Sequence, residues 1–178
     1  LDDYASVHDE NNQQNSEVVF AVQYTTDQIT NATNVGGEGG GGNNLHLFFG
    51  MQYDTQAGMV RDVFFGRPFK RLRPTNYCLT TVFGERTNDS RYKKSFRDTW
   101  TCNSPGSFNT SFDNSKSRVT FAAGDTTIFI PGFEMSQAER AKRKYQVLVP
   151  SRYDEALFPT LQKFFDTKRA DRTEPRGS

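Results

Sequence analysis

The sequence predicts a mixed α and β fold with much irregular loop structure, and three observations support this class. Hydrophobic residues make up only 34% of the 178-residue chain, below the roughly 45–50% (glycine included) of ordinary globular domains. Apolar residues gather in short β-rich runs, and helix-capping signals precede only a few segments. We therefore expect residues 1–178 to form a single partial domain, a fragment that shares its core with segments outside it.

The first quarter of the chain is expected to hold one helix end, one strand and one loop. Leu1, Tyr4 and Ala5 are spaced like one face of a helix. Residues 16–24 are β-rich and mostly apolar, which predicts a buried strand. Residues 27–44 form a Gly-rich loop that is expected to be flexible, and a loop that folds over a ligand is the alternative.

Two helices and one strand are predicted in the middle of the chain. Thr75 follows a proline and can cap a helix over residues 75–83, which Gly84 would end. A turn at residues 88–92 enters a second, short helix. Residues 95–102 alternate in a way that allows a strand with a mixed polar and apolar face.

The last third of the chain contains three short apolar segments, at residues 119–121, 126–130 and 147–149. The first two are expected to be strands. Residues 103–116 are polar and predict a turn region. Ser136 and Glu139 form a capping-box pattern, which predicts the start of a helix. Residues 159–165 are expected to form one or two helical turns.

Charge and hydropathy exclude several classes of protein. The formal net charge of +1 argues against a nucleic-acid-binding protein, because such proteins usually carry a strong basic excess. No apolar run approaches the roughly 20 residues that a membrane-spanning helix needs. No Cys-x-x-Cys pattern is present, and His8 and His46 lie far apart, so no metal site and no cofactor are predicted. Cys78 and Cys102 could form a disulfide or serve as two separate small hydrophobic residues, and the sequence leaves both open.

Four separated segments resemble elements of one protein family and occur in the expected order. They are residues 15–20 (NSEVVF), 66–75 (GRPFKRLRPT), 89–92 (DSRY) and 158–164 (FPTLQKF). Each segment alone is a weak signal, but together they span most of the chain. They resemble the SusD/RagB-type outer-membrane nutrient-binding lipoproteins.

The resemblance implies a fold, a function and a location. The chain would be the loop-rich middle region of a mainly α-helical fold with a tetratricopeptide-like scaffold, whose other N- and C-terminal helices lie outside this chain. It would capture a glycan without catalysis at the cell surface, as part of polysaccharide utilisation. A SusC-like TonB-dependent outer-membrane transporter would be its partner, and a lipid anchor would lie upstream of this chain. Some relatives serve peptide uptake, so a peptide ligand is an alternative.

Glycan binding predicts exposed aromatic rings beside polar groups that bind hydroxyls. Trp100 is the only tryptophan and lies between polar residues, with Asn103 shortly after it. Tyr53 and Asp54 combine an aromatic ring with a carboxylate acceptor. We therefore predict these four residues as ligand-binding, although Trp100 and Tyr53 are also residue types that commonly anchor a core.

Catalysis is the alternative from a different functional class. A glycoside hydrolase needs two carboxylates about 5–10 Å apart. The candidates in this chain are Asp54, Asp62, Asp98 and Glu134. Nothing in the sequence brings two of them together, and no nucleophile or phosphate-loop motif is present. The sequence therefore predicts a binding protein and not an enzyme.

Basic and aromatic residues are interleaved over residues 61–73. A nucleic-acid interpretation would use the rings for stacking and the cations for phosphates. The near-neutral net charge favours a structural interpretation, in which the cations are paired and the rings pack beneath. Residues 66–75 are therefore expected to be structural and not to contact ligand. Three side chains should be held by carboxylates or backbone carbonyls, namely Arg67, Arg71 and Arg73.

Overall fold

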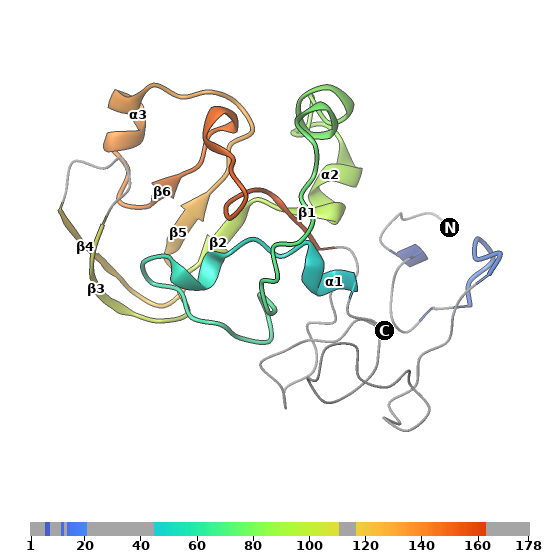
Figure 1. Cartoon of the computed structure of the whole chain (residues 1–178), viewed down its shortest axis with the longest axis horizontal. Coiled ribbons are helices and arrows are strands. Elements are labelled where there is room, and N and C mark those ends of the chain that lie inside the picture. Colours follow the sequence, from blue (N-terminus) through green and yellow to red (C-terminus); the bar gives the residue numbers. More distant parts are fainter. Residues whose placement is uncertain (1–5, 8–11, 13, 21–44, 111–116, 163–178) are drawn as a thin grey trace.

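The computed structural model describes residues 6–7, 12, 14–20, 45–110 and 117–162. These residues form a small β-rich domain, in which seven short strands and three short α-helices are joined by irregular segments (Figure 1). The strands belong to three separate sheets, two of them two-stranded and one three-stranded.

The three-stranded sheet lies at the centre of the domain. Strand β5 (Thr126–Phe129) is its middle strand, antiparallel to β2 (Thr99–Thr101) and parallel to β6 (Gln146–Val147). Both Thr127 and Ile128 of β5 are buried, so this strand is covered on both faces. The β-branched and aromatic residues of β5 suit such a position, and the strand predicted at residues 126–130 is present.

A second sheet is the hairpin of β3 (Gly106–Asn109) and β4 (Arg118–Phe121). Strand β4 was expected, whereas β3 lies in a region that the sequence predicts to be turn. The prediction is wrong for these residues because a polar segment can still pair with an amphipathic neighbour. One such contact across the two strands is the 2.7 Å hydrogen bond between the hydroxyls of Ser107 and Thr120.

The third sheet joins distant parts of the chain. Strand β1 (Phe96–Arg97) is antiparallel to β7 (Thr160–Leu161), with Phe96 opposite Leu161. The helical turns predicted at residues 159–165 are therefore wrong for the described part of that range, which ends at residue 162. The local sequence is compatible with a helix, but pairing with β1 holds it extended.

Two of the predicted helices are present, and each begins at a capping side chain. Helix α2 (Ser90–Ser95) starts after Asp89, whose side chain accepts a hydrogen bond from the backbone amide of Arg91. Helix α3 (Gln137–Ala141) starts with a complete capping box between Ser136 and Glu139. Both predictions are confirmed because the side chain and the amide that it caps are only two or three residues apart.

The predicted helix after Thr75 is also present, but its main part is a π-helix, η3 (Cys78–Val82). The Thr75 hydroxyl accepts a hydrogen bond from the amide of Cys78 at 3.1 Å, as a capping residue does. The amide of Phe83 then bonds to the carbonyl of Cys78, which is the wider spacing of a π-helix. The remaining helical elements are one α-helical turn, α1 (Leu45–Phe48), and two 3₁₀ turns, η2 (Tyr53–Thr55) and η4 (Pro150–Arg152).

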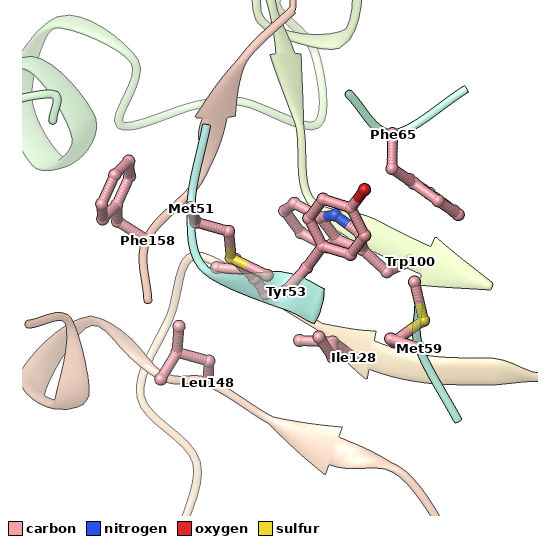
Figure 2. Packing of buried hydrophobic residues seen from close by; sticks show 9 residues of the cluster. Met51, Tyr53, Met59, Phe65, Trp100, Ile128, Leu148 and Phe158 are labelled. Carbon is pink, nitrogen blue, oxygen red and sulfur yellow. The ribbon is translucent and has the colours of Figure 1, made fainter. Parts of the chain in front are cut away.

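The main hydrophobic core lies between the central sheet and the segment that contains η2. Its buried members are Met51, Tyr53, Met59, Phe65, Trp100, Ile128, Ile130, Leu148 and Phe158. Figure 2 shows Trp100 and Ile128 on neighbouring strands, with Tyr53 and Met51 packed above them. Burial of these large side chains is the main stabilising contribution to the domain, at about 1.5–3 kcal/mol for each.

Two smaller clusters surround this core. One contains Leu79, Tyr92 and Phe96, with Cys78 packed against it. The other contains Cys102 with two side chains of strand β4. Both thiols are free and belong to different clusters, so the interpretation as two separate small hydrophobic residues is the correct one. Burial raises the pKa of the Cys78 thiol.

The fold class predicted from the sequence is wrong. The described α-helices are four to six residues long, too short to bury the apolar stripe that packs one helix of a tetratricopeptide-like pair against the next. The domain buries its apolar residues mainly through strands and irregular segments. It is a small β-rich domain and not part of a mainly α-helical scaffold.

The strand predicted at residues 16–24 is likewise wrong for its described part. Residues 16–20 form turns and bends, and the side chains of Val19 and Phe20 are exposed. A run of β-forming residues becomes a buried strand only when another strand pairs with it. The helix predicted at residues 1–9 lies almost entirely outside the described residues, and the Gly-rich loop at 27–44 lies wholly outside them.

Candidate functional site

The two aromatic residues predicted to bind a ligand are core residues. Trp100 is 1% exposed and Tyr53 is 2% exposed, and Figure 2 shows both inside the main hydrophobic core. A ring that stacks on a sugar must present one face to solvent. The burial of both rings therefore favours the alternative that the sequence left open: large aromatic side chains often anchor a core.

The hydroxyl of Tyr53 holds a neighbouring segment in place. It donates a hydrogen bond to the carbonyl of Gly66 at 2.6 Å and accepts one from the amide of Asp62 at 3.3 Å. Burial raises the pKa of the Tyr53 hydroxyl well above its usual range, so the group remains a neutral donor. Tyr53 thus fastens the segment of residues 60–66, called here the 60–66 loop, to the core.

Asp54 and Asn103 contact the same loop. The Asp54 carboxylate forms a salt bridge with Arg61 at 3.2 Å. The Asn103 side chain accepts a hydrogen bond from the amide of Val60 at 2.8 Å and donates to the carbonyl of Val60 at 2.7 Å. Its amide nitrogen also donates to the carboxylate of Asp62 at 2.6 Å. The structure therefore brings three of the four predicted residues together, but their polar atoms bind the 60–66 loop.

The outer side of the 60–66 loop carries a residue that the sequence-based site missed. Phe64 is 54% exposed, whereas its neighbour Phe65 is buried in the core. Phe64 and Phe65 lie in a turn at residues 63–65, where the amide of Gly66 bonds to the carbonyl of Asp62 at 3.0 Å. The alternation of side chains along a strand does not apply to a turn, so the sequence held no simple signal for which of the two rings would be exposed. The expectation that the rings of this run pack beneath the cations holds for Phe65, which is buried, and for Phe69, which lies under Arg67, but not for Phe64.

The guanidinium group of Arg97 packs against the exposed ring of Phe64. Its guanidinium carbon lies 4.6 Å from the centre of the Phe64 ring and 4.8 Å from that of Phe65. One guanidinium nitrogen donates to the carbonyl of Phe64 at 3.1 Å, and Nε donates to the side chain of Gln162 at 3.1 Å. Burial lowers the pKa of Arg97 to about 10, which leaves the side chain charged at neutral pH.

Phe64 is therefore held in a defined orientation. Its ring meets that of Phe65 edge to face at 5.0 Å, and Arg97 approaches its ring while bonding its backbone carbonyl. Arg61 of the same loop forms its salt bridge with Asp54, and both side chains are only partly buried. An aromatic surface that is fixed in this way can stack against the apolar face of a ligand ring.

The carboxylates considered for catalysis are used in local structure. Asp62 accepts hydrogen bonds from the amide of Phe65 and the side chain of Asn103. Asp98 accepts one from the hydroxyl of Thr99. Glu134 accepts two from Ser151, through its amide at 2.7 Å and its hydroxyl at 2.8 Å. The described residues contain no group of three or more His, Cys, Asp or Glu side chains that could hold a metal ion.

The segment of residues 66–75 is structural in its backbone, as predicted. Gly66 adopts a φ of 75°, in the left-handed region that favours glycine. Backbone amides from Phe69 to Leu72 bond to carbonyls of Leu47, Phe48 and Gly50. Its side chains agree less well with the prediction. Arg67 lies over the Phe69 ring and Arg73 donates to the carbonyl of Asp154, but the side chain of Arg71 is exposed.

Comparisons with known proteins assign no family to this chain. No protein-family model matches it, and no curated protein matches it. Among the residues that the structure describes, no helix is both long enough and apolar enough to span a membrane. The candidate site therefore depends on the geometry around the 60–66 loop.

Proposed function

We propose that this chain captures a glycan without cleaving it, and that Phe64 is the ring on which a sugar stacks. The exposed, fixed position of Phe64 is the observation that carries this proposal. A pyranose presents an apolar face of C–H groups, which suits a flat aromatic surface. Because Phe64 is already held by Arg97 and Phe65, binding would cost little side-chain entropy at this position.

Polar groups near the ring would then bind sugar hydroxyls. The guanidinium of Arg61 is partly exposed and the Asp54 carboxylate lies beside it. Charged donors and acceptors of this kind form the stronger class of hydrogen bonds. The buried Trp100 and Tyr53 would contribute only indirectly, by holding the 60–66 loop.

The wider role rests on the resemblance of four segments to SusD/RagB-type proteins. On that basis the bound glycan would be passed to a TonB-dependent outer-membrane transporter, with this protein at the cell surface. The internal hydrogen bonds of Asp62 and Glu134 are consistent with binding alone, because each carboxylate already accepts two of them.

The test is a comparison of two exposed phenylalanines. Phe64→Ala should weaken binding to a glycan identified from a panel by about tenfold or more, equivalent to about 1–3 kcal/mol if sugar stacking resembles base stacking. Phe133→Ala is the matched control, because Phe133 is 60% exposed but lies outside the 60–66 loop. Isothermal titration calorimetry measures both affinities, and thermal unfolding shows whether each variant is folded.

Three outcomes would contradict the proposal. Equal affinity for wild type and a folded Phe64→Ala variant would remove Phe64 from the site. Appearance of shortened products at enzyme-like rates would identify a glycoside hydrolase instead. Binding to peptides but to no member of the glycan panel would favour the peptide-uptake alternative.

A further inference from the structure

Three exposed cations are concentrated within four residues, and they are Lys70, Arg71 and Arg73. Their polar contacts within the described residues are to neutral groups. Lys70 Nζ donates to the side-chain carbonyl of Gln52 at 2.6 Å, and Arg73 donates to the backbone carbonyl of Asp154 at 3.0 Å. No salt bridge to a described carboxylate involves any of the three. We call residues 70–73 the basic strip.

Three other basic residues are paired with carboxylates. Arg61, Arg91 and Lys144 each form a salt bridge, with Asp54, Asp89 and Asp125 respectively. The chain has nearly equal numbers of acidic and basic residues, 21 and 22. A local excess of exposed cations therefore arises from their arrangement and not from the overall composition. Such an excess attracts an anionic partner.

The backbone beneath the basic strip is held firmly. The amides of Lys70, Arg71 and Leu72 donate to carbonyls of Phe48 and Gly50 at 2.9–3.0 Å. Lys70 itself has a φ of 45°, which is uncommon for a residue with a side chain. Such a conformation persists only where the surrounding structure imposes it, and it is found most often at functional sites. The three cations thus project from a fixed backbone.

We propose that the basic strip selects a glycan that carries carboxylate groups, such as a polymer of uronic acids. This inference rests on the proposed function and names the class of glycan. Guanidinium groups bind carboxylates through paired hydrogen bonds, and ammonium groups bind them as point charges. Phe64 and Lys70 are six residues apart, so the chain between them spans at most about 22 Å. This distance is within the length of one oligosaccharide.

The experiment compares two polymers that share one sugar backbone and differ in the group that carries the charge. Polygalacturonate carries a carboxylate on each sugar, and its methyl ester does not. Wild type should bind polygalacturonate at least about tenfold more tightly at low salt, a difference of about 1.4 kcal/mol, and this preference should decrease as salt increases. The variant Lys70→Gln/Arg71→Gln/Arg73→Gln should lose the preference but retain affinity for the ester.

Lys142→Gln/Arg143→Gln is the matched control. It removes exposed cations near helix α3 and should leave the preference unchanged. Arg71→Gln alone is a second test variant: it removes one exposed side chain from the strip, so it should lower the preference even if the triple variant does not fold.

Equal affinity of wild type for the two polymers would overturn the inference, as would equal loss of preference in the Lys142/Arg143 variant. Binding of oligothymidylate as tight as that of polygalacturonate would also overturn it, because it would indicate unspecific attraction to polyanions.

The two proposals fail in different ways. If the ester binds in a Phe64-dependent manner and charge adds nothing, only the role of the basic strip is wrong. If neither polymer nor any other glycan depends on Phe64, the proposed function itself is wrong.

Discussion

At the residue scale, the lack of a side chain at Gly132 provides the space that the buried, charged side chain of Arg86 occupies. Gly132 has a φ of 80°, and a Cβ atom there would lie 2.3 Å from the guanidinium carbon of Arg86. Arg86 is buried and donates to the Tyr92 hydroxyl at 2.9 Å and to the Leu79 carbonyl at 3.2 Å. The absence of a side chain at Gly132 therefore makes room for the cation that joins these groups.

Gly132→Ala should destabilise the domain by about 2–4 kcal/mol. Strain at a positive φ contributes about 1–2 kcal/mol, and displacement of Arg86 would leave buried polar groups without partners. Gly124→Ala is the matched control, because Gly124 has a φ of 82° but nothing within 4 Å of its Cβ position. Gly124→Ala should therefore lose only the stability that the strain at positive φ costs. Urea unfolding measures both, and equal losses would mean that Arg86 can move without cost.

The sequence did not predict well which aromatic side chains are buried and which are exposed. Trp100 and Tyr53 were expected to face a ligand, but both lie in the core, while Phe64 is exposed. Composition shows that an aromatic residue is present, but which side of the chain is covered depends on pairing and packing far away in sequence. Trp100 is buried because β5 and the segment with η2 pack against β2, and neither contact is visible from its neighbours.

At the element scale, the starts of the helices were predicted well from the sequence, in contrast to the burial of single residues. Thr75 and Ser136 were predicted as start signals, and each accepts the expected backbone hydrogen bond. The helix after the turn at residues 88–92 was also predicted, and the structure shows that Asp89 caps it. Capping depends on atoms within two or three residues, so local sequence contains the information. Strand β3 and strand β7 were missed because each exists only through a partner strand. The same reasoning explains why exposed residues 16–20 are not a strand.

Asp89→Ala should destabilise the domain by about 1 kcal/mol through loss of the cap of helix α2. Hydrogen bonds from Arg91 hold the pKa of the Asp89 carboxyl below its usual value. Helix α2 places Tyr92 in a hydrophobic cluster, so a frayed start would loosen that packing. Asp89→Asn should retain most of the stability, since asparagine caps as well as aspartate. Chemical denaturation compares the two, and an equally large loss in Asp89→Asn would show that charge, not capping, is important.

At the scale of the whole molecule, the domain combines one main core with two smaller clusters. Tyr53 and Tyr92 are buried members of two of them, and Tyr153 packs against both. The Tyr53 hydroxyl bonds the 60–66 loop, and the Tyr92 hydroxyl accepts a hydrogen bond from Arg86. The hydroxyl of Tyr153 is buried near the charged Arg86 side chain, but it forms no hydrogen bond of ordinary geometry with the described residues. The stability of the domain therefore depends on whether these three phenol groups are protonated.

Stability should therefore fall at alkaline pH. Burial raises the pKa of Tyr53, Tyr92 and Tyr153 above the usual value of 10.0. Because the folded state favours the neutral phenol, the stabilisation is complete below about pH 10 and is lost as pH rises toward the folded-state pKa values. Each such tyrosine contributes a slope of up to about 1.4 kcal/mol per pH unit. Urea unfolding between pH 8 and pH 11 measures this decline.

Two variants separate titration from hydrogen bonding. At pH 8, Tyr53→Phe should cost about 1–2 kcal/mol because it removes two hydrogen bonds, whereas Tyr153→Phe should cost little. Above pH 10 each variant should decline less steeply than wild type, because one buried phenol no longer loses its proton. A wild-type stability that stays constant up to pH 11 would mean that these hydroxyls become accessible to water without unfolding. The packing around Tyr53, and with it the fixed position of the 60–66 loop, would then be looser than the geometry indicates.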